Sequence, residues 1–383
     1  VTCPGKLGNK ALKMVPNTKQ KSNFDYLLKN NVNDKYEASL LTVKNISFKE
    51  PKFEYSGACA GCGETPYLTN LTRVFSDNLI IANATGCSSI YGGSVPSTPY
   101  SIPWASSLFE DNSEYGLGIL TGINIKRDKI QKYMKEYPRN KVFKKWLDNK
   151  DNYSVCREVL NEIDYKKHPF LLNMKDYILP KSVWIVGGDG FAYDIGYGGL
   201  DHVLSKQENI NILVLDTEVY SNTGGQSSKS SNLGSVASFT SKGKENYKKD
   251  LARIAMCYPH VYVAATNIGY NKEQYLKVLK EASEHNGPSL VIAYSPCIEH
   301  GIKTGMEHSQ SNAYLASKCG YFLTFRSNPN GKFILDSKNP EFDKYEDYLM
   351  TENRFANLKR VNKEEAEEMK AKLEETGASV EVK

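Results

Sequence analysis

Two short apolar runs, separated by a glycine-rich turn and a helical segment, mark the centre of the chain. Val183 to Val186 leads into Gly187-Gly188-Asp189-Gly190, and Ile212 to Leu215 leads into Asp216-Thr217. This order of strand, glycine turn, helix and strand predicts a βαβ unit. Backbone N–H groups at the start of its helix, unobstructed at the glycines, favour an anion such as phosphate.

Apolar runs also alternate with helical patterns on either side of this unit. We expect a helix at Glu273 to His285 and further strands at Leu79 to Ala82, Val261 to Ala265 and Leu290 to Tyr294. Such alternation predicts an α/β fold with a doubly wound, mainly parallel sheet and helices on both faces. Two more runs, Phe322 to Arg326 and Lys332 to Leu335, predict a small C-terminal hairpin.

The chain divides around this predicted core. We interpret residues 1–50 as a connector and residues 51–335 as the α/β domain, with a helical insertion at 101–177. Residues 336–383 are expected to be a helical extension that ends in a capped amphipathic helix, Asn362 to Gly377.

Composition narrows the classes of partner. The 383 residues carry 49 basic and 44 acidic side chains, and no basic patch is interleaved with aromatic residues, so no nucleic-acid partner is expected. No apolar run approaches the roughly 18 residues of a membrane span, and no signal peptide is read. Eight cysteines with one C-x-x-C favour a metal site in a reducing compartment, the cytoplasm or an anaerobic organelle.

Asp189 changes what the glycine turn can bind. An acidic side chain there repels a bare phosphate, whereas Mg²⁺ binds readily through one carboxylate together with phosphate oxygens. A dinucleotide site needs a third glycine where Tyr193 stands, and no P-loop sequence occurs. From the residues alone, the interpretation that this segment is only a tight turn also remains open. Thr217 and Asn222 follow the next strand, so we expect them at the same sheet edge.

Four cysteines follow predicted strands or share one loop: Cys59, Cys62, Cys87 and Cys297. Two thiolates two residues apart, joined by two more that the fold supplies, build both Zn(Cys)₄ and [4Fe–4S] sites, and spacing leaves these alternatives open. The other internal cysteines are interpreted as small buried hydrophobic residues: Cys156, Cys257 and Cys319.

Longer strings carry a resemblance to a known family. Gly188-Asp189-Gly190 with the Thr217–Asn222 segment resembles the thiamine diphosphate motif, and the chain resembles the pyruvate:ferredoxin oxidoreductase family over roughly residues 1–360. The strings are DTEVYSNTGGQ (Asp216 to Gln226), EYSGACAGCGETPY (Glu54 to Tyr67), ANATGCSSIYGGSVPSTPY (Ala82 to Tyr100), SLFEDNSEYGLG (Ser107 to Gly118) and AYSPCIEHGIKTGM (Ala293 to Met306).

The resemblance implies a cofactor site for thiamine diphosphate. Mg²⁺ would be held by the Asp189 carboxylate, the Thr217 hydroxyl and the Val219 carbonyl. Asn222 would be the catalytic residue beside the reactive carbon, although the residues alone favour a turn role for it. Further cofactor contacts implied are Glu64, Cys87, Gly188, Gly190, Phe191, Glu218, Tyr220 and Ser221.

The resemblance also implies a [4Fe–4S] cluster on Cys59, Cys62, Cys87 and Cys297, and an activity. That activity is oxidative decarboxylation of pyruvate with coenzyme A, giving acetyl-CoA and CO₂. Electrons would pass singly to iron–sulfur clusters and then to ferredoxin, flavodoxin or a fused NADP reductase. Another 2-oxoacid, a non-redox thiamine decarboxylase and a zinc-stapled non-catalytic domain stay open as alternatives.

The family places other parts outside this chain. The carboxylate that activates the cofactor is implied to lie in upstream domains, and a ferredoxin-like domain to precede Cys3-Pro4, whose sequence is typical of the end of a ferredoxin cysteine run. A homodimer is also implied. The loop between Pro99 and Trp104 is shorter than the family's, so substrate or coenzyme A contacts made there are not carried over.

Overall fold

The computed structural model describes residues 16, 21–29, 42–49, 52–53, 56–93, 102, 104–329, 331–361, 367 and 371. The Cys3-Pro4 pair and most of both the predicted helix at Asn362 to Gly377 and the loop between Pro99 and Trp104 therefore lie outside the described residues.

A single eight-stranded sheet runs through the described part of the chain, in the order β2-β1-β3-β4-β6-β5-β7-β8. The first six strands in this order are parallel, and β7 and β8 form the predicted antiparallel hairpin. The strands are β1 (Leu79–Ala84), β2 (Trp104–Ser107), β3 (Ser182–Gly187), β4 (Asn211–Asp216), β5 (Tyr262–Thr266), β6 (Ser289–Tyr294), β7 (Phe325–Asn328) and β8 (Lys332–Leu335). The predicted mainly parallel, doubly wound sheet is confirmed.

Helices cover both faces of this sheet. One face packs against α5 (Asn112–Lys135), α10 (Tyr197–Leu204) and α11 (Leu251–Ala255), and the other packs against α3 (Thr65–Phe75) and α12 (Lys272–Glu284). Successive side chains of β3 enter opposite cores, so every position from Val183 to Val186 is apolar and buried.

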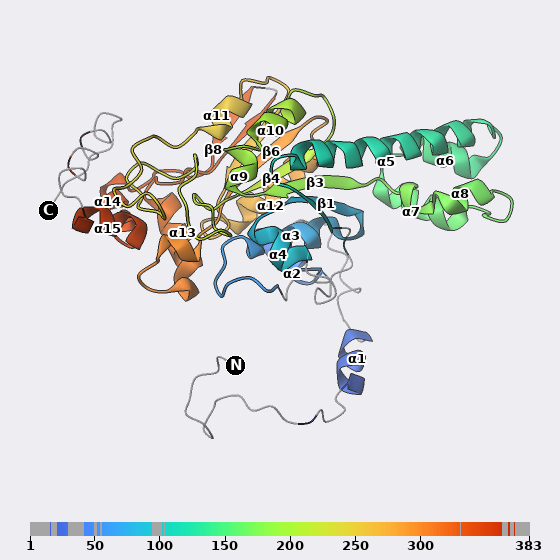
Figure 1. Ribbon diagram of the computed structural model, residues 1–383. Helices are drawn as coiled ribbons and strands as arrows, with labels where there is room; N and C mark the ends of the chain where they lie inside the picture. Colours follow the sequence, from blue (N-terminus) through green and yellow to red (C-terminus); the bar gives the residue numbers. More distant parts are fainter. Residues whose placement is uncertain are drawn as a thin grey trace.

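A helical arm projects from one side of the sheet (Figure 1). It consists of the far half of α5 with α6 (Lys141–Asn149), α7 (Tyr153–Glu162) and α8 (Pro169–Asn173), packed around a separate core that includes Trp146 and Phe143. The range 101–177 is not wholly helical as predicted, because it begins with edge strand β2. Only four residues long and half-buried, β2 has no alternating pattern that could reveal it.

The last described helices pack back onto the α/β domain. They are α13 (Ser309–Lys318), α14 (Tyr345–Leu349) and α15 (Asn353–Val361), and the Arg354 carbonyl accepts a 2.7 Å hydrogen bond from the Val236 backbone N–H. The remaining α-helices are α1 (Lys21–Lys29), α2 (Val43–Ser47), α4 (Cys87–Gly93) and α9 (Asp189–Ala192). Within the described ranges no helix is long and apolar enough to cross a membrane.

The cysteines outside the predicted cluster do not all behave alike. Cys156 and Cys319 are buried, as predicted. Cys257 is exposed, so its prediction was wrong: it lies in the turn after α11, beyond the residues that face the sheet.

Candidate cofactor and cluster site

A cavity of about 420 Å³ lies at the carboxyl ends of the central parallel strands. The turn after β3, the loop after β4 and residues 85–88 after β1 form its walls. In an open parallel sheet this is the edge where ligands bind. The lining brings together most of the predicted cofactor contacts, namely Glu64, Cys87, Gly188, Asp189, Gly190, Phe191, Val219, Tyr220, Ser221 and Asn222.

The glycine turn gives this cavity a small polar end. Gly188 is extended and precedes the single-turn helix α9, and a side chain at Gly190 would lie within 3.3 Å of Phe109 and Tyr220. The apolar side chains of Phe109 and Ile195 also line the cavity. This combination suits a ligand with a phosphate end and a flat organic end.

Asp189 is a buried carboxylate at the polar end. Its Oδ1 accepts the Thr217 backbone N–H at 3.3 Å, and its Oδ2 accepts the Ser228 hydroxyl at 2.6 Å. Burial, followed by the neighbouring charge of Asp216, raises the pKa of Asp189 well above its ordinary value. A cation at this position would reverse that effect.

The three oxygens predicted to bind Mg²⁺ lie in one contact group. The Thr217 hydroxyl donates to the Val219 carbonyl at 3.0 Å, and the Thr217 N–H contacts Asp189. Among the described residues no group of three or more His, Cys, Asp or Glu could hold a metal ion unaided. A single carboxylate with two neutral oxygens fits Mg²⁺, which takes its other ligands from water and phosphate.

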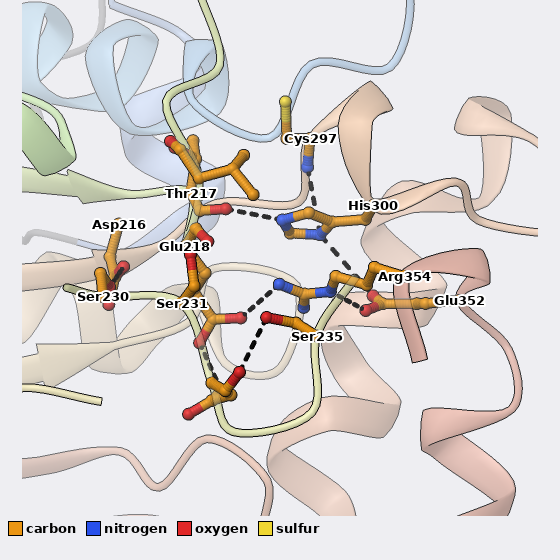
Figure 2. A network of polar contacts seen from close by, with 12 residues as sticks. Asp216, Thr217, Glu218, Ser230, Ser231, Ser235, Cys297, His300, Glu352 and Arg354 are labelled. Carbon is orange, nitrogen blue, oxygen red and sulfur yellow. Dashed lines mark hydrogen bonds and ion pairs between the residues drawn. The ribbon is translucent and has the colours of Figure 1, made fainter. Parts of the chain in front are cut away.

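Two predicted contacts do not line this cavity: Thr217 lines the neighbouring cavity that contains the cysteines, and Glu218 lines neither. The Glu218 side chain forms ion pairs with Lys248 at 2.9 Å and with Arg354 at 2.8 Å. Figure 2 shows the pair with Arg354. Burial alone would raise its pKa, but Lys248 and then Arg354 lower the pKa of Glu218 to about 2. Its backbone is left-handed, with φ 58°, between Thr217 and Val219. We therefore correct its role to that of an anchor for the two neighbouring oxygens.

All four predicted cluster cysteines line a second cavity, of about 180 Å³. Cys59 and Cys62 lie in the turn before α3, Cys87 begins α4, and Cys297 follows β6. The turn requires glycine at Gly61, because φ is +73° and a Cβ would lie 2.0 Å from the Met306 carbonyl oxygen.

The electrostatics of this cavity favour a cationic occupant. Burial, followed by the charge of Glu64, raises the pKa of Cys62 to about 12 and that of Cys87 to about 11, and burial also raises the pKa of Cys297. Iron bound to the thiolates would offset these shifts. A cavity needs only about 10–15 Å³ to hold a water molecule. The cavity therefore has room for a bound group, and its geometry leaves a single Zn²⁺ and a [4Fe–4S] cluster as alternatives.

The two cavities share a wall. Four side chains line both: Glu64, Cys87, Ser221 and Asn222. The Cys87 thiol donates to the Ser221 hydroxyl at 3.3 Å, which joins the cluster loop to the cofactor loop. Glu64 is buried and accepts a 2.5 Å hydrogen bond from the Tyr91 hydroxyl, and burial raises the pKa of Glu64 to about 7. A cofactor and a cluster bound here would be in direct proximity.

Several supporting residues were not predicted from the sequence. Ser228 contacts Asp189, and Lys244 donates to the Ser228 carbonyl at 2.8 Å. His300 contacts both Thr217 and Cys297. The serine-rich stretch after Gln226 and the histidine three positions after Cys297 were the available signals, but neither has a spacing that indicates its partner.

Family models match parts of the chain. A family model described as the C-terminal TPP binding domain of thiamine pyrophosphate enzymes matches residues 173–293, which contain the glycine turn and the loop after β4. A second model, the ribosomal protein L7/L12 C-terminal domain, matches residues 352–383, most of which lie outside the described residues. Among solved structures, a 2-oxoglutarate:ferredoxin oxidoreductase from Magnetococcus marinus aligns with 65% of this chain and 67% of its own, at 18% identity and a TM-score of 0.45.

Curated relatives match almost the whole chain. It is 45% identical to pyruvate:ferredoxin oxidoreductase of Moorella thermoacetica, over 97% of this chain and 34% of the relative. It is 45% identical to pyruvate-flavodoxin oxidoreductase of Klebsiella pneumoniae, over 87% and 31%, and 40% identical to pyruvate dehydrogenase [NADP(+)] of Cryptosporidium parvum, over 92% and 22%. The chain thus spans about a third or less of each relative's length. It belongs to the pyruvate:ferredoxin (flavodoxin) oxidoreductase family, of which it is the thiamine pyrophosphate-binding part.

Proposed function

We propose that this chain supplies the cofactor and cluster sites of an enzyme that oxidatively decarboxylates pyruvate with coenzyme A, giving acetyl-CoA and CO₂. The observation that carries the proposal is the shared wall: a phosphate-type cavity and a four-cysteine cavity meet at Glu64, Cys87, Ser221 and Asn222. A non-redox decarboxylase would have no use for the cysteines, and a zinc-stapled domain would have no use for Asp189.

The chain's own residues would hold the cofactor by its diphosphate. The Asp189 carboxylate, the Thr217 hydroxyl and the Val219 carbonyl would bind Mg²⁺, and the Gly188–Gly190 turn would accept the phosphate oxygens. Bound thiamine diphosphate supplies the carbanion chemistry that removes CO₂ from a 2-oxoacid. Phe109 and Ile195 would exclude water from the organic part of the cofactor.

Asn222 would act on the substrate side of the shared wall. Its side chain is exposed at the point where both cavities open, and its amide can donate to an oxygen of pyruvate. Cys59, Cys62, Cys87 and Cys297 would ligate a [4Fe–4S] cluster, which accepts electrons one at a time. Because Cys87 lines both cavities, an electron would have no intervening layer of protein to cross.

The remaining partners are proposed from the relatives' names and from the family resemblance of the sequence. Electrons would go on to ferredoxin, flavodoxin or a fused NADP reductase, and other domains of the full enzyme, including a ferredoxin-like one, would complete the substrate and coenzyme A sites. We further propose a homodimer in a reducing compartment, the cytoplasm or an anaerobic organelle, where the exposed Cys59 stays available to iron.

Iron, sulfide and zinc analysis of protein purified without oxygen tests this function. The proposal requires about four irons and about four sulfides per chain, together with Mg²⁺-dependent binding of thiamine diphosphate. Binding of the cofactor without iron would identify a non-redox thiamine enzyme. Stoichiometric zinc without cofactor binding would identify a structural domain, and either result would refute the proposal.

A further inference from the structure

His300 lies between the two sites and contacts both. The residue is fully buried at the end of the short η4 helix (Ile298–His300), directly after the turn that carries Cys297. Its Nε2 is 2.6 Å from the Thr217 carbonyl oxygen, and its Nδ1 is 3.4 Å from the Cys297 backbone nitrogen (Figure 2). Thr217 and Cys297 follow two neighbouring parallel strands, β4 and β6.

The partners of the ring determine its tautomer. A carbonyl oxygen can only accept, so Nε2 carries the proton and donates to Thr217. A backbone N–H can only donate, so Nδ1 accepts from Cys297. The ring therefore uses both nitrogens at once, and it provides a direct hydrogen-bonded link between the peptide of a proposed Mg²⁺ ligand and that of a proposed cluster ligand.

Each end of this link is itself tied to ligand atoms. The Thr217 hydroxyl contacts the Val219 carbonyl, and these are two of the oxygens proposed for Mg²⁺. At the other end, Cys297 and His300 form a reciprocal cap in which the Cys297 sulfur accepts a backbone N–H of the following turn. The positions of the oxygens and of the sulfur thus depend on the same ring.

Residues from the C-terminal segment surround the other side of the His300 ring. The Glu352 carboxylate, whose Oε1 lies 3.7 Å from His300 Nδ1, accepts hydrogen bonds from Asn312, at 2.7 Å, and Tyr348, at 3.1 Å. Arg354 pairs with Glu352 at 2.7 Å and with Glu218 at 2.8 Å, which returns the network to the loop that contains Thr217 (Figure 2). A fully buried network of this kind has few alternative arrangements.

We infer that His300 is a positioning residue through which the cluster site and the Mg²⁺–diphosphate site are coupled. Filling the cluster site would immobilise Cys297. Because the His300 ring is hydrogen-bonded to both Cys297 and Thr217, the ring and the Thr217 peptide would be immobilised as well. The Mg²⁺ ligands would then already be ordered when the cofactor binds, so less conformational entropy would be lost on binding. The coupling is reciprocal, so the cofactor would stabilise the cluster by the same factor. This inference rests on the proposed function for the identity of the two ligands.

The test measures thiamine diphosphate binding to the full chain by calorimetry at saturating Mg²⁺, with and without a reconstituted cluster. For the unmodified chain we expect binding to be about 5- to 150-fold tighter with the cluster present. His300→Phe should bring this ratio close to one. His300→Gln, whose amide can donate one hydrogen bond and accept another as the ring does in these two contacts, should keep most of it.

A matched control is available in the same chain. His285 Nε2 lies 2.8 Å from the His260 carbonyl oxygen, which repeats the ring-to-backbone contact away from both cavities. His285→Phe should leave the ratio unchanged. The reciprocal effect, stabilisation of the cluster by the cofactor, needs no activity assay. It is measured as the loss of iron to a chelator, which absorbance monitors with and without cofactor.

The outcomes separate this inference from the proposed function. A chain that binds neither ligand would refute both. If the chain binds both ligands but binds thiamine diphosphate equally tightly with and without the cluster, the coupling alone is overturned. This outcome does not depend on whether any His300 variant folds. An undiminished ratio in His300→Phe would show that the coupling does not pass through the ring.

Discussion

The Ser228 hydroxyl donates a buried 2.6 Å hydrogen bond to the carboxylate of Asp189, which lies 39 positions earlier in the chain. Ser228 is held in turn by Lys244, whose ammonium group donates to the carbonyls of Ser228 at 2.8 Å and Ser231 at 2.6 Å. A ligating carboxylate fixed by such a partner presents its oxygens in one orientation. The loop after Gln226 therefore positions the proposed metal ligand without contacting the metal.

Removing this partner should weaken metal binding without unfolding the protein. We expect Ser228→Ala to lower the apparent Mg²⁺ affinity, measured in the presence of thiamine diphosphate, by about 10- to 100-fold. Ser283→Ala, which removes an exposed hydroxyl bonded to the Lys280 carbonyl, is the control. Equal Mg²⁺ affinities in the two variants would show that Ser228 does not support the proposed metal site.

The colour and iron content of cysteine variants should distinguish the proposed cluster ligands from the other cysteines. Protein purified without oxygen should be brown and contain about four irons, and Cys297→Ser should lose most of the iron because the four thiolates bind it cooperatively. Cys257→Ser is the control, since Cys257 is exposed and lies outside the cluster cavity. Equal iron content in the two variants would refute the cluster assignment.

Glu64 should make the stability of the cofactor-free chain depend on pH. Its pKa is raised by burial to about 7, whereas in the unfolded chain it is near 4.5. Between these values the folded state keeps the proton and the unfolded state loses it, so the free energy of unfolding falls as pH rises from about 4.5 to about 7. Over this pH interval the fall amounts to about 2–3 kcal/mol.

Urea unfolding at pH 5 and pH 8 measures this effect. Glu64→Gln cannot ionise, so its decline over the interval should be smaller than that of the unmodified chain by roughly that amount. The comparison cancels the contributions of other titrating groups. Parallel declines in the two proteins would mean that Glu64 is already ionised at pH 5.

We also expect the 383-residue chain to bind its cofactor without oxidising pyruvate. The cofactor must be activated by a carboxylate in close contact. Only Glu64 and Asp189 among the described residues bring one to the cofactor cavity. Asp189 is proposed for Mg²⁺, and Glu64 also faces the cysteine cavity. Pyruvate-dependent dye reduction should therefore stay at background until the remaining domains of the enzyme are added. Robust turnover by the chain alone would show that Glu64 or another local group suffices.

The central part of the fold could be predicted because its signals are local. Strands β3, β4 and β6 are continuous apolar runs that end in turn residues, and the carboxyl-edge rule then brings Asp189 and Thr217 together. Edge strand β2 was missed because it is short and half-exposed. The identity of the cofactor came from resemblance, because a glycine turn with one acidic residue also fits a plain turn.

The supporting contacts could not be predicted because they join distant segments. His300 and Thr217 are 83 positions apart, and Arg354 reaches Glu218 from a segment expected to be a separate extension. Glu218 was assigned to the cofactor by its place in the motif, whereas its left-handed backbone turns its side chain toward Arg354 and Lys248. Sequence spacing carries no information on such directions.

Calorimetric titration of the chain with thiamine diphosphate tests the central claim most directly. Because Asp189 is the carboxylate proposed for Mg²⁺, binding should require Mg²⁺ and should be lost in Asp189→Asn, while the exposed Asp151→Asn keeps it. Binding of equal strength in a metal chelator, or in Asp189→Asn, would contradict the account.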